Sequence, residues 1–262
     1  MRIGFIGCGK MGGAILRGIN GKVVNKEDIS VYELNSSIVQ NLKNDKIDVV
    51  STITELCSKV EVILLAIKPQ DFSSLLNSLK GNVSNKLIIT IAAGVKIGAI
   101  ENALGNIKVA RAMPNTAAAI GEASSVLCFN SLCENEDKDF AEKIFNAIGK
   151  VVLIEEDLMD EVIPIGGSFT AFEYYFYKGF LESSLKRGVP YETAKKLLVQ
   201  SIIGSAKMIE SDDRPIDDLI SDVCSKGGTT LAGLKAFEDN NLLKICDDCA
   251  VYCANRSKEL GK

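Results

Sequence analysis

The sequence contains no histidine, the side chain that enzymes use most often as a general acid or base near neutral pH. A proton needed in a reaction would have to come from Lys, Tyr, Cys, a carboxyl group, a hydroxyl group or water. The absence also weakens any zinc site, because Cys246, Cys249 and Cys253, which share a helical spacing, have no histidine to complete a ligand set. We therefore predict no metal site and expect these three thiols to pack in a core, where free cysteine is common.

Long runs of a single residue class are missing as well. No apolar stretch approaches the roughly 18 to 20 residues that span a bilayer, and the N-terminus leads into strand-like sequence without a signal-peptide pattern. Lys and Arg form no long run and the net charge is -4, so nothing indicates a nucleic-acid or membrane partner. We expect a cytoplasmic protein with eight reduced cysteines and a small-molecule partner.

Short β-branched runs alternate with helical patterns in the first part of the chain. The expected strands are residues 2–6, 29–33, 60–67, 86–91 and 107–113, and 123–129 and 150–154 could extend the same sheet on either side of a polar helix near 135–148. From about Asp160 the strand rhythm stops and apolar residues recur at spacings of three and four. These patterns predict an α/β fold: a Rossmann-type, doubly wound, mostly parallel sheet in residues 1–158, followed by an all-helical domain in 159–262.

A glycine-rich turn follows the first expected strand. Gly7, Gly9 and Gly12 have the G-x-G-x-x-G spacing, with a strand before them, a helix after them and Glu33 at the end of the second strand. The first glycine would permit a tight turn, the second would let the backbone approach a pyrophosphate, and the third would let the helix lie against the strand. A glycine turn without a ligand is the alternative, but this context favours a dinucleotide.

Glu33 is expected to bind the ribose 2′-hydroxyl of NAD and to repel the 2′-phosphate of NADP. Asn35, Ser36 and Ser37 could still hold a phosphate, so the cofactor is NADPH or NADH, with a modest preference for NAD. Further contacts are expected where later strands end, in AIKPQ (66–70), IAAGV (91–95) and RAMPNT (111–116). The expected cofactor-binding residues are Ile6, Gly7, Cys8, Gly9, Lys10, Met11, Gly12, Glu33, Asn35, Ala66, Ile67, Lys68, Pro69, Ala92, Ala93, Gly94 and Asn115.

A second glycine pair interrupts the helical region near the C-terminus, in VCSKGGTT (223–230). Glycine in a helix interior costs about 1 kcal/mol relative to alanine, so the pair needs a structural or functional reason. One reading is a helix-helix turn closed by threonine caps. The other is a loop whose backbone N–H groups, leading into a helix, bind an anion. A phosphate-binding P-loop is rejected because its lysine would follow the glycines, whereas Lys226 precedes them.

Taken together, GCGKMGGAI, LLAIKPQ, ITIAAGV, VARAMPNTAAAIGE and SKGGTTLAGLKAFE resemble the signature segments of the pyrroline-5-carboxylate reductase family, in the family's order and over essentially the whole chain. The resemblance implies hydride transfer from NAD(P)H to the C=N bond of 1-pyrroline-5-carboxylate, giving L-proline in the last step of proline biosynthesis. It also implies substrate binding by Ser225, Gly227, Gly228, Thr229 and Thr230, with the Thr230 hydroxyl as the catalytic group at the imine nitrogen. A homodimer is implied too, in some members gathered into a larger ring. The long amphipathic helices, with little sheet to cover them, favour the same dimer.

Two departures from the family keep other functions open. GGSFTAF (166–172) stands where the family has a segment like SGSGPAY, and Lys226 occupies a position that is usually proline. These changes leave open a catalytically weak, cofactor-binding relative with a regulatory role. A β-hydroxyacid dehydrogenase is a further hypothesis, but its catalytic lysine would have to be Lys178, poorly spaced from Gly166 and Gly167, and it leaves SKGGTT unexplained.

Overall fold

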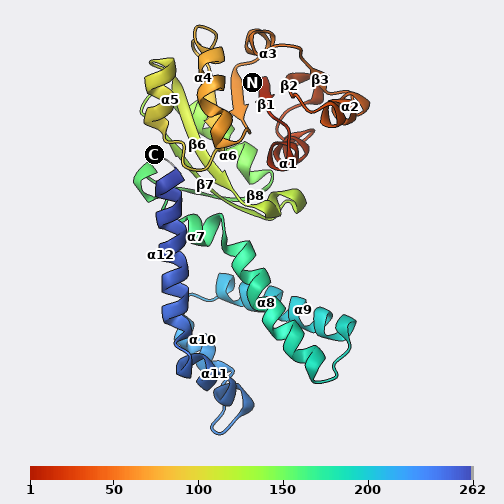
Figure 1. The fold of residues 1–262 in the computed structure, drawn as a ribbon, viewed down its shortest axis with the longest axis vertical. Coiled ribbons are helices and arrows are strands. Elements are labelled where there is room, and N and C mark those ends of the chain that lie inside the picture. The colour runs from red at the N-terminus through yellow and green to blue at the C-terminus, as the bar shows by residue number, and fades with distance from the viewer. Residues whose placement is uncertain (261–262) are drawn as a thin grey trace. The chain divides into compact units, whose positions relative to one another are not determined.

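The computed structural model describes residues 1–260, apart from the side chains of Pro69 and Leu260, and the chain divides into two compact units (Figure 1). Unit 1 comprises Met1–Thr170 together with the end of α12 (Leu242–Leu260) from Tyr252 onward. Unit 2 comprises Ala171–Val251. The domain boundary after residue 158 stays a prediction, and the chain passes between the two units twice.

Unit 1 is built on one eight-stranded sheet within residues 1–260, with the order β3-β2-β1-β4-β5-β6-β7-β8. Neighbouring strands are parallel except β6 and β7, so the predicted doubly wound, mostly parallel sheet is confirmed. The sequence did not reveal β3, because two residues are too few to show an alternating pattern. The strands are β1 (Ile3–Ile6), β2 (Ile29–Tyr32), β3 (Asp48–Val49), β4 (Val62–Leu65), β5 (Leu87–Thr90), β6 (Lys108–Pro114), β7 (Ala123–Phe129) and β8 (Gly149–Leu153).

Helices cover both faces of this sheet because successive strand side chains point to opposite sides. Ile3 and Phe5 of β1 belong to a core shared with α1 and α6, whereas Ile6 belongs to the core shared with α3, α4 and α5. Figure 1 shows the sheet between these layers. The helices are α1 (Lys10–Ile19), α2 (Ser36–Asn44), α3 (Ile53–Lys59), α4 (Phe72–Leu79), α5 (Ile97–Leu104), α6 (Asn135–Asn146) and α7 (Ile163–Gly166), with short 3-10 turns η1 (Lys26–Asp28), η2 (Pro69–Asp71), η3 (Thr116–Ile120) and η4 (Glu156–Leu158).

A buried polar cluster holds the end of α12 in unit 1. The Arg111 guanidinium on β6 lies 3.2 Å from Glu156 Oε1 and 3.8 Å from Asp160 Oδ1. The Ser257 hydroxyl of α12 donates to the same Asp160 oxygen at 2.6 Å, and both of these residues are buried. Because a buried charge needs partners, this cluster fixes where the terminal helix returns to the sheet.

Unit 2 is helical, as the spacing of apolar residues predicts. It contains most of α8 (Phe169–Lys186), then α9 (Tyr191–Ser211), α10 (Ile216–Asp222), α11 (Thr229–Asp239) and the first part of α12. Gly188, with φ +83°, makes the turn between α8 and α9. Phe176 and Phe180 of α8 pack edge-on or tilted against Phe237 of α11, with ring centroids 6.0 and 6.4 Å apart.

Little else in unit 2 is buried. Ala194 is the one buried residue found in the described part of α8 to α11. Large apolar side chains such as Tyr175 and Leu197 are 78% and 64% exposed. The apolar faces of these helices are therefore not covered by their own chain.

The cysteines of α12 differ from the expectation. Cys246 is exposed and Cys249 and Cys253 are half-buried, so the predicted core position is wrong for Cys246, because that face of the helix lies uncovered in the single chain. Within residues 1–260 no group of three Cys, Asp or Glu side chains is placed to hold a metal ion. None of the helices in this described range combines the length and apolar character needed to cross a membrane.

Candidate functional site

A cavity of about 730 Å³ opens in unit 1 where β1, β2 and β4 end. At this point the strand order reverses: the chain leaves β1 toward β2 and β3 and then returns to β4 on the other side of β1. Open α/β sheets bind ligands at such a point, because the loops after the two central strands diverge and leave a crevice. The lining residues are Ile6, Gly7, Gly9, Lys10, Met11, Tyr32, Glu33, Leu34, Asn35, Ile38, Ala66, Ile67, Lys68, Gln70, Asp71, Ile91 and Pro114.

The three glycines after β1 differ in how much space surrounds the position that a Cβ atom would occupy. Gly7 has φ +85°, and a Cβ there would lie 2.7 Å from the Ala66 carbonyl oxygen. A Cβ at Gly12 would lie 2.7 Å from the Gly7 carbonyl oxygen, so both positions require glycine for backbone packing. Gly9, by contrast, has nothing within 4 Å of a Cβ and lines the cavity. Its missing side chain leaves room for a ligand rather than for another part of the chain.

The N-terminal end of α1 supplies positive potential to this cavity. Gly9 is the N-cap and its position offers no side-chain oxygen, so the first N–H groups of the helix have no partner within it. Lys10 in the first turn and Lys68 after β4 also line the cavity. Unpaired N–H groups, the helix dipole and two ammonium groups together favour an anionic ligand such as a pyrophosphate.

Glu33 ties the glycine-rich turn to the end of β2. Its Oε2 accepts a hydrogen bond from the Cys8 N–H at 2.6 Å, and its Oε1 accepts from the N–H groups of Leu34 and Asn35, both at 2.8 Å. A carboxylate has about four acceptor positions, so capacity remains for one ligand hydroxyl. The Asn35 side chain caps α2 by accepting from the N–H groups of Ser37 and Ile38 at 3.0 and 3.2 Å.

Ten of the expected cofactor-binding residues line the cavity, and six do not: Cys8, Gly12, Ala92, Ala93, Gly94 and Asn115. Cys8 is buried beside it, and burial raises the pKa of its thiol to about 11, so it stays protonated near neutral pH. Asn115 is buried too: its Nδ2 donates to the Gly166 carbonyl at 3.0 Å and its Oδ1 accepts from the Ala117 N–H at 3.1 Å. Ala92, Ala93 and Gly94 are not among the lining residues, and the Pro69 side chain lies outside what the structure describes.

Sequence reasoning included three further lining residues, Gln70, Ile91 and Pro114, only as members of expected segments, and it missed Tyr32, Leu34, Ile38 and Asp71. Tyr32, Leu34 and Ile38 lie at or after the end of β2, and Gln70 and Asp71 follow Lys68. Ile91 directly follows β5, and Pro114 is the last residue of β6. All seven lie within, or within three residues of, the segments and residues singled out above. A search for residues at or just after the predicted strand ends would have found most of them, because the cavity follows the carboxyl edge of the sheet.

The SKGGTT segment forms the turn between α10 and α11 in unit 2. Gly227 has φ +73°, and the Gly228 N–H donates to the Ser225 carbonyl at 2.8 Å. A Cβ at Gly228 would collide with the Ser225 hydroxyl oxygen, so this position also requires glycine. Thr229 and Thr230 form the first turn of α11 and are exposed. The cavity belongs to unit 1 and this turn belongs to unit 2.

A doubly wound sheet with a glycine-rich turn and an anion-attracting cavity at its switch point defines an NAD(P)H-dependent oxidoreductase. Two family models match the chain: residues 2–94 match NADP oxidoreductase, coenzyme F420-dependent, and residues 156–260 match pyrroline-5-carboxylate reductase dimerisation. The second match assigns oligomerisation to the C-terminal region.

Whole-chain relatives identify the family. The chain is 34% identical to the pyrroline-5-carboxylate reductase of Methanosarcina acetivorans and 30% identical to that of Arabidopsis thaliana, covering all of this chain and 98% and 96% of those proteins. The NADP-bound pyrroline carboxylate reductase of Plasmodium falciparum has a TM-score of 0.92 at 32% identity, over 100% of this chain and 98% of that one. The chain belongs to the pyrroline-5-carboxylate reductase family, as its motifs predict.

Proposed function

We propose that the protein reduces the C=N bond of 1-pyrroline-5-carboxylate to give L-proline, with NADH or NADPH as the reductant. The observation that carries the proposal is the full-length similarity to pyrroline-5-carboxylate reductases, which extends across both the cavity of unit 1 and the α10–α11 turn of unit 2. The departures in GGSFTAF lie outside the residues that line the cavity.

The cavity residues fit a dinucleotide. Gly9 leaves room for the pyrophosphate, the first turn of α1 offers N–H groups, and Lys10 and Lys68 offer positive charge. Glu33 would accept a hydrogen bond from the ribose 2′-hydroxyl and repel a 2′-phosphate, so we infer a preference for NADH. Bound here, a reduced nicotinamide supplies the hydride.

The α10–α11 turn would hold the substrate carboxylate. Backbone N–H groups at Gly227 and Thr229 lead into α11, while the Gly228 N–H closes the turn on the Ser225 carbonyl, and Ser225 and Thr230 are exposed. The Thr230 hydroxyl would hydrogen bond the imine nitrogen, either directly or by relaying a proton from water. Since a threonine is a weak acid, a substrate that arrives as the protonated iminium is the simpler of these routes, because Thr230 then only has to orient the nitrogen. Orientation then supplies several kcal/mol of barrier lowering.

The uncovered helices of unit 2 support a two-fold homodimer, because an isologous interface would bury the same apolar faces on both copies. Assembly of dimers into a larger ring and a cytoplasmic location belong to the same proposal. No nucleic-acid or membrane partner is needed for the reaction.

The direct test follows the absorbance of the reduced nicotinamide with purified protein and 1-pyrroline-5-carboxylate, once with NADH and once with NADPH. Oxidation that depends on the imine, faster with NADH, is the expected result. Cofactor binding without oxidation would replace the proposal by a regulatory relative. Reduction of NAD by a β-hydroxyacid, with no activity on the imine, would replace it by a dehydrogenase.

A further inference from the structure

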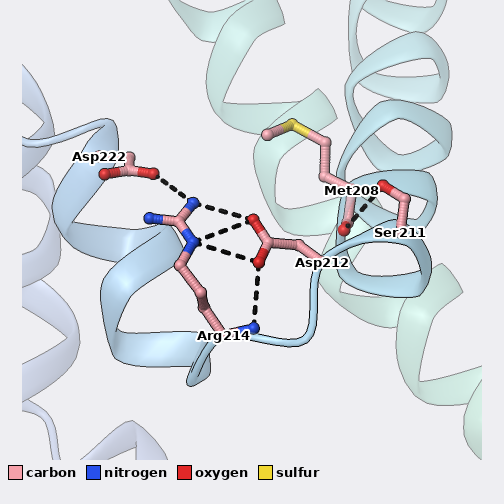
Figure 2. Close-up of polar contacts among 5 residues, drawn as sticks. All are labelled: Met208, Ser211, Asp212, Arg214 and Asp222. Atoms are coloured by element: carbon pink, nitrogen blue, oxygen red, sulfur yellow. Dashed lines mark hydrogen bonds and ion pairs between the residues drawn. The ribbon is translucent and has the colours of Figure 1, made fainter.

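Arg214 joins the two ends of α10 in unit 2 (Figure 2). Its Nε donates to Asp212 Oδ1 at 3.1 Å and its Nη2 donates to Asp212 Oδ2 at 2.8 Å, which is the two-point geometry of a guanidinium on a carboxylate. The same Nη2 donates to Asp222 Oδ2 at 2.8 Å, and the Arg214 backbone N–H donates to Asp212 Oδ1 at 3.0 Å. Asp212 lies before α10 and Asp222 is the last residue of α10. The Arg214 side chain therefore links the segment before the helix to the C-terminal end of the helix.

The end of α10 is the starting point of the α10–α11 turn. Two residues separate Asp222 from Ser225, and the Cys224 N–H still donates to the Ser221 carbonyl at 3.0 Å. Beyond Ser225, Gly227 and Gly228 give the backbone wide conformational freedom. The direction in which the turn leaves α10 therefore depends on how firmly Asp222 is held.

Arg214 also sets the charge next to the turn. Asp212 and Asp222 together carry two negative charges, and the guanidinium offsets one of them. Its side-chain and backbone hydrogen bonds hold the pKa of the Asp212 carboxyl below its usual value, so Asp212 stays ionised and keeps the contact. Exposed single ion pairs contribute little to overall stability, so the consequence of this cluster is local geometry and potential.

We propose that Arg214 is a positioning residue for the substrate carboxylate, which orders residues 223–228 by holding Asp222 and reduces the repulsion between Asp222 and an anionic substrate. The inference rests on the proposed function of the α10–α11 turn. It assigns a role in the reaction to a side chain that lies outside the turn itself.

Steady-state kinetics test the effect on the substrate. Arg214→Gln is expected to raise the KM for the imine about tenfold while kcat falls by less than about threefold and the KM for NADH stays unchanged. Arg214→Lys keeps the positive charge but loses the two-point contact of the guanidinium. Its KM for the imine should therefore lie between those of Arg214→Gln and the native protein. Asp222→Asn added to Arg214→Gln should recover part of the lost affinity by removing a like charge. Lys235→Gln, which breaks the exposed Lys235–Asp239 pair on α11, is the matched control and should change none of these constants.

Trypsin supplies a readout that needs no activity. Lys226 lies in the turn and is exposed, whereas Arg214 precedes proline and is not a tryptic site, so the substitution leaves the cleavage pattern itself intact. Cleavage after Lys226, followed by mass spectrometry, should be several-fold faster in Arg214→Gln than in the native protein and unchanged by Lys235→Gln.

The outcomes separate the two proposals. Unchanged cleavage, or faster cleavage with an unchanged KM for the imine, would overturn the role of Arg214 while leaving the reductase proposal in place. Native protein that oxidises neither NADH nor NADPH with the imine would overturn the proposed function, and the role of Arg214 in substrate binding would fall with it.

Discussion

Unit 1 and unit 2 bury their apolar residues in different ways. In unit 1 both faces of the sheet are covered by helices of the same chain, and Phe5, Phe145 and Ile15 are fully buried. In unit 2 the helices share one aromatic cluster, and many of their large apolar side chains stay exposed. The first unit therefore has a core of its own, whereas the second leaves apolar faces exposed in the region that matches a dimerisation family.

Breaking the association should give the largest effect. Tyr175→Glu combined with Leu197→Glu places two charges on the exposed apolar face of unit 2 and should convert the oligomer to a monomer, because burying an unpaired charge costs several kcal/mol. Light scattering after size-exclusion chromatography measures the mass. Ile120→Glu, at an equally exposed position of unit 1, is the control. An unchanged mass in the double variant would show that this face is not the interface.

The second-largest effect is expected from removing a buried side chain in the core of unit 1. Phe145→Ala removes a fully buried ring from α6 and should lower the free energy of unfolding by about 3–5 kcal/mol. Urea unfolding measures the change, and the difference from the native protein should not vary with protein concentration if the core belongs to one chain. Leu153→Ala on β8, where the side chain is half exposed, should cost less than about 1 kcal/mol. Equal losses in the two variants would contradict a self-contained core.

Removing the proposed catalytic hydroxyl in unit 2 should affect turnover rather than either core. Thr230→Ala is expected to lower kcat about 100-fold, since the substrate nitrogen loses its hydrogen-bond partner, with cofactor affinity unchanged because the cofactor cavity lies in unit 1. Stopped-flow turnover and cofactor titration measure the two quantities. Equal losses in rate and in cofactor affinity would remove the assignment.

The smallest effect is expected at Glu33. Glu33→Gln removes the negative charge that would face a 2′-phosphate, so the ratio of kcat/KM for NADH to that for NADPH should fall about tenfold, equivalent to about 1.4 kcal/mol. Asp28→Asn, an acidic residue in a turn before β2, is the control because it does not line the cavity. A ratio that stays constant in Glu33→Gln would mean that another group selects the cofactor.

Much of the fold could be predicted because its signals are local. Strands of this sheet read as short β-branched runs, and seven of the eight were found within two residues of their observed ends. A local preference of the same kind is seen in unit 2, where Gly188 adopts a positive φ in the turn between α8 and α9. β3 escaped prediction because its two residues owe their strand conformation to pairing with β2.

The candidate site could be predicted only in part. The G-x-G-x-x-G spacing indicated Gly9, whose open surroundings in the structure agree with a ligand-facing position. Nothing near Asn115 in the sequence reveals that its amide bonds Gly166, 51 residues later. The exposure of Cys246 was likewise hidden, because helical spacing shows which residues share a face but not what covers that face.

Backbone preferences and residues close together in the chain were enough to predict most of the order of strands and helices, the glycine turn after β1 and the family. Three features became visible only in the folded chain: β6 and β7 run antiparallel, Glu33 accepts a hydrogen bond from the Cys8 N–H, and the apolar faces of unit 2 are exposed. The physical reason is that pairing, burial and charge contacts join residues far apart in the chain, and their free energy appears only when those residues meet.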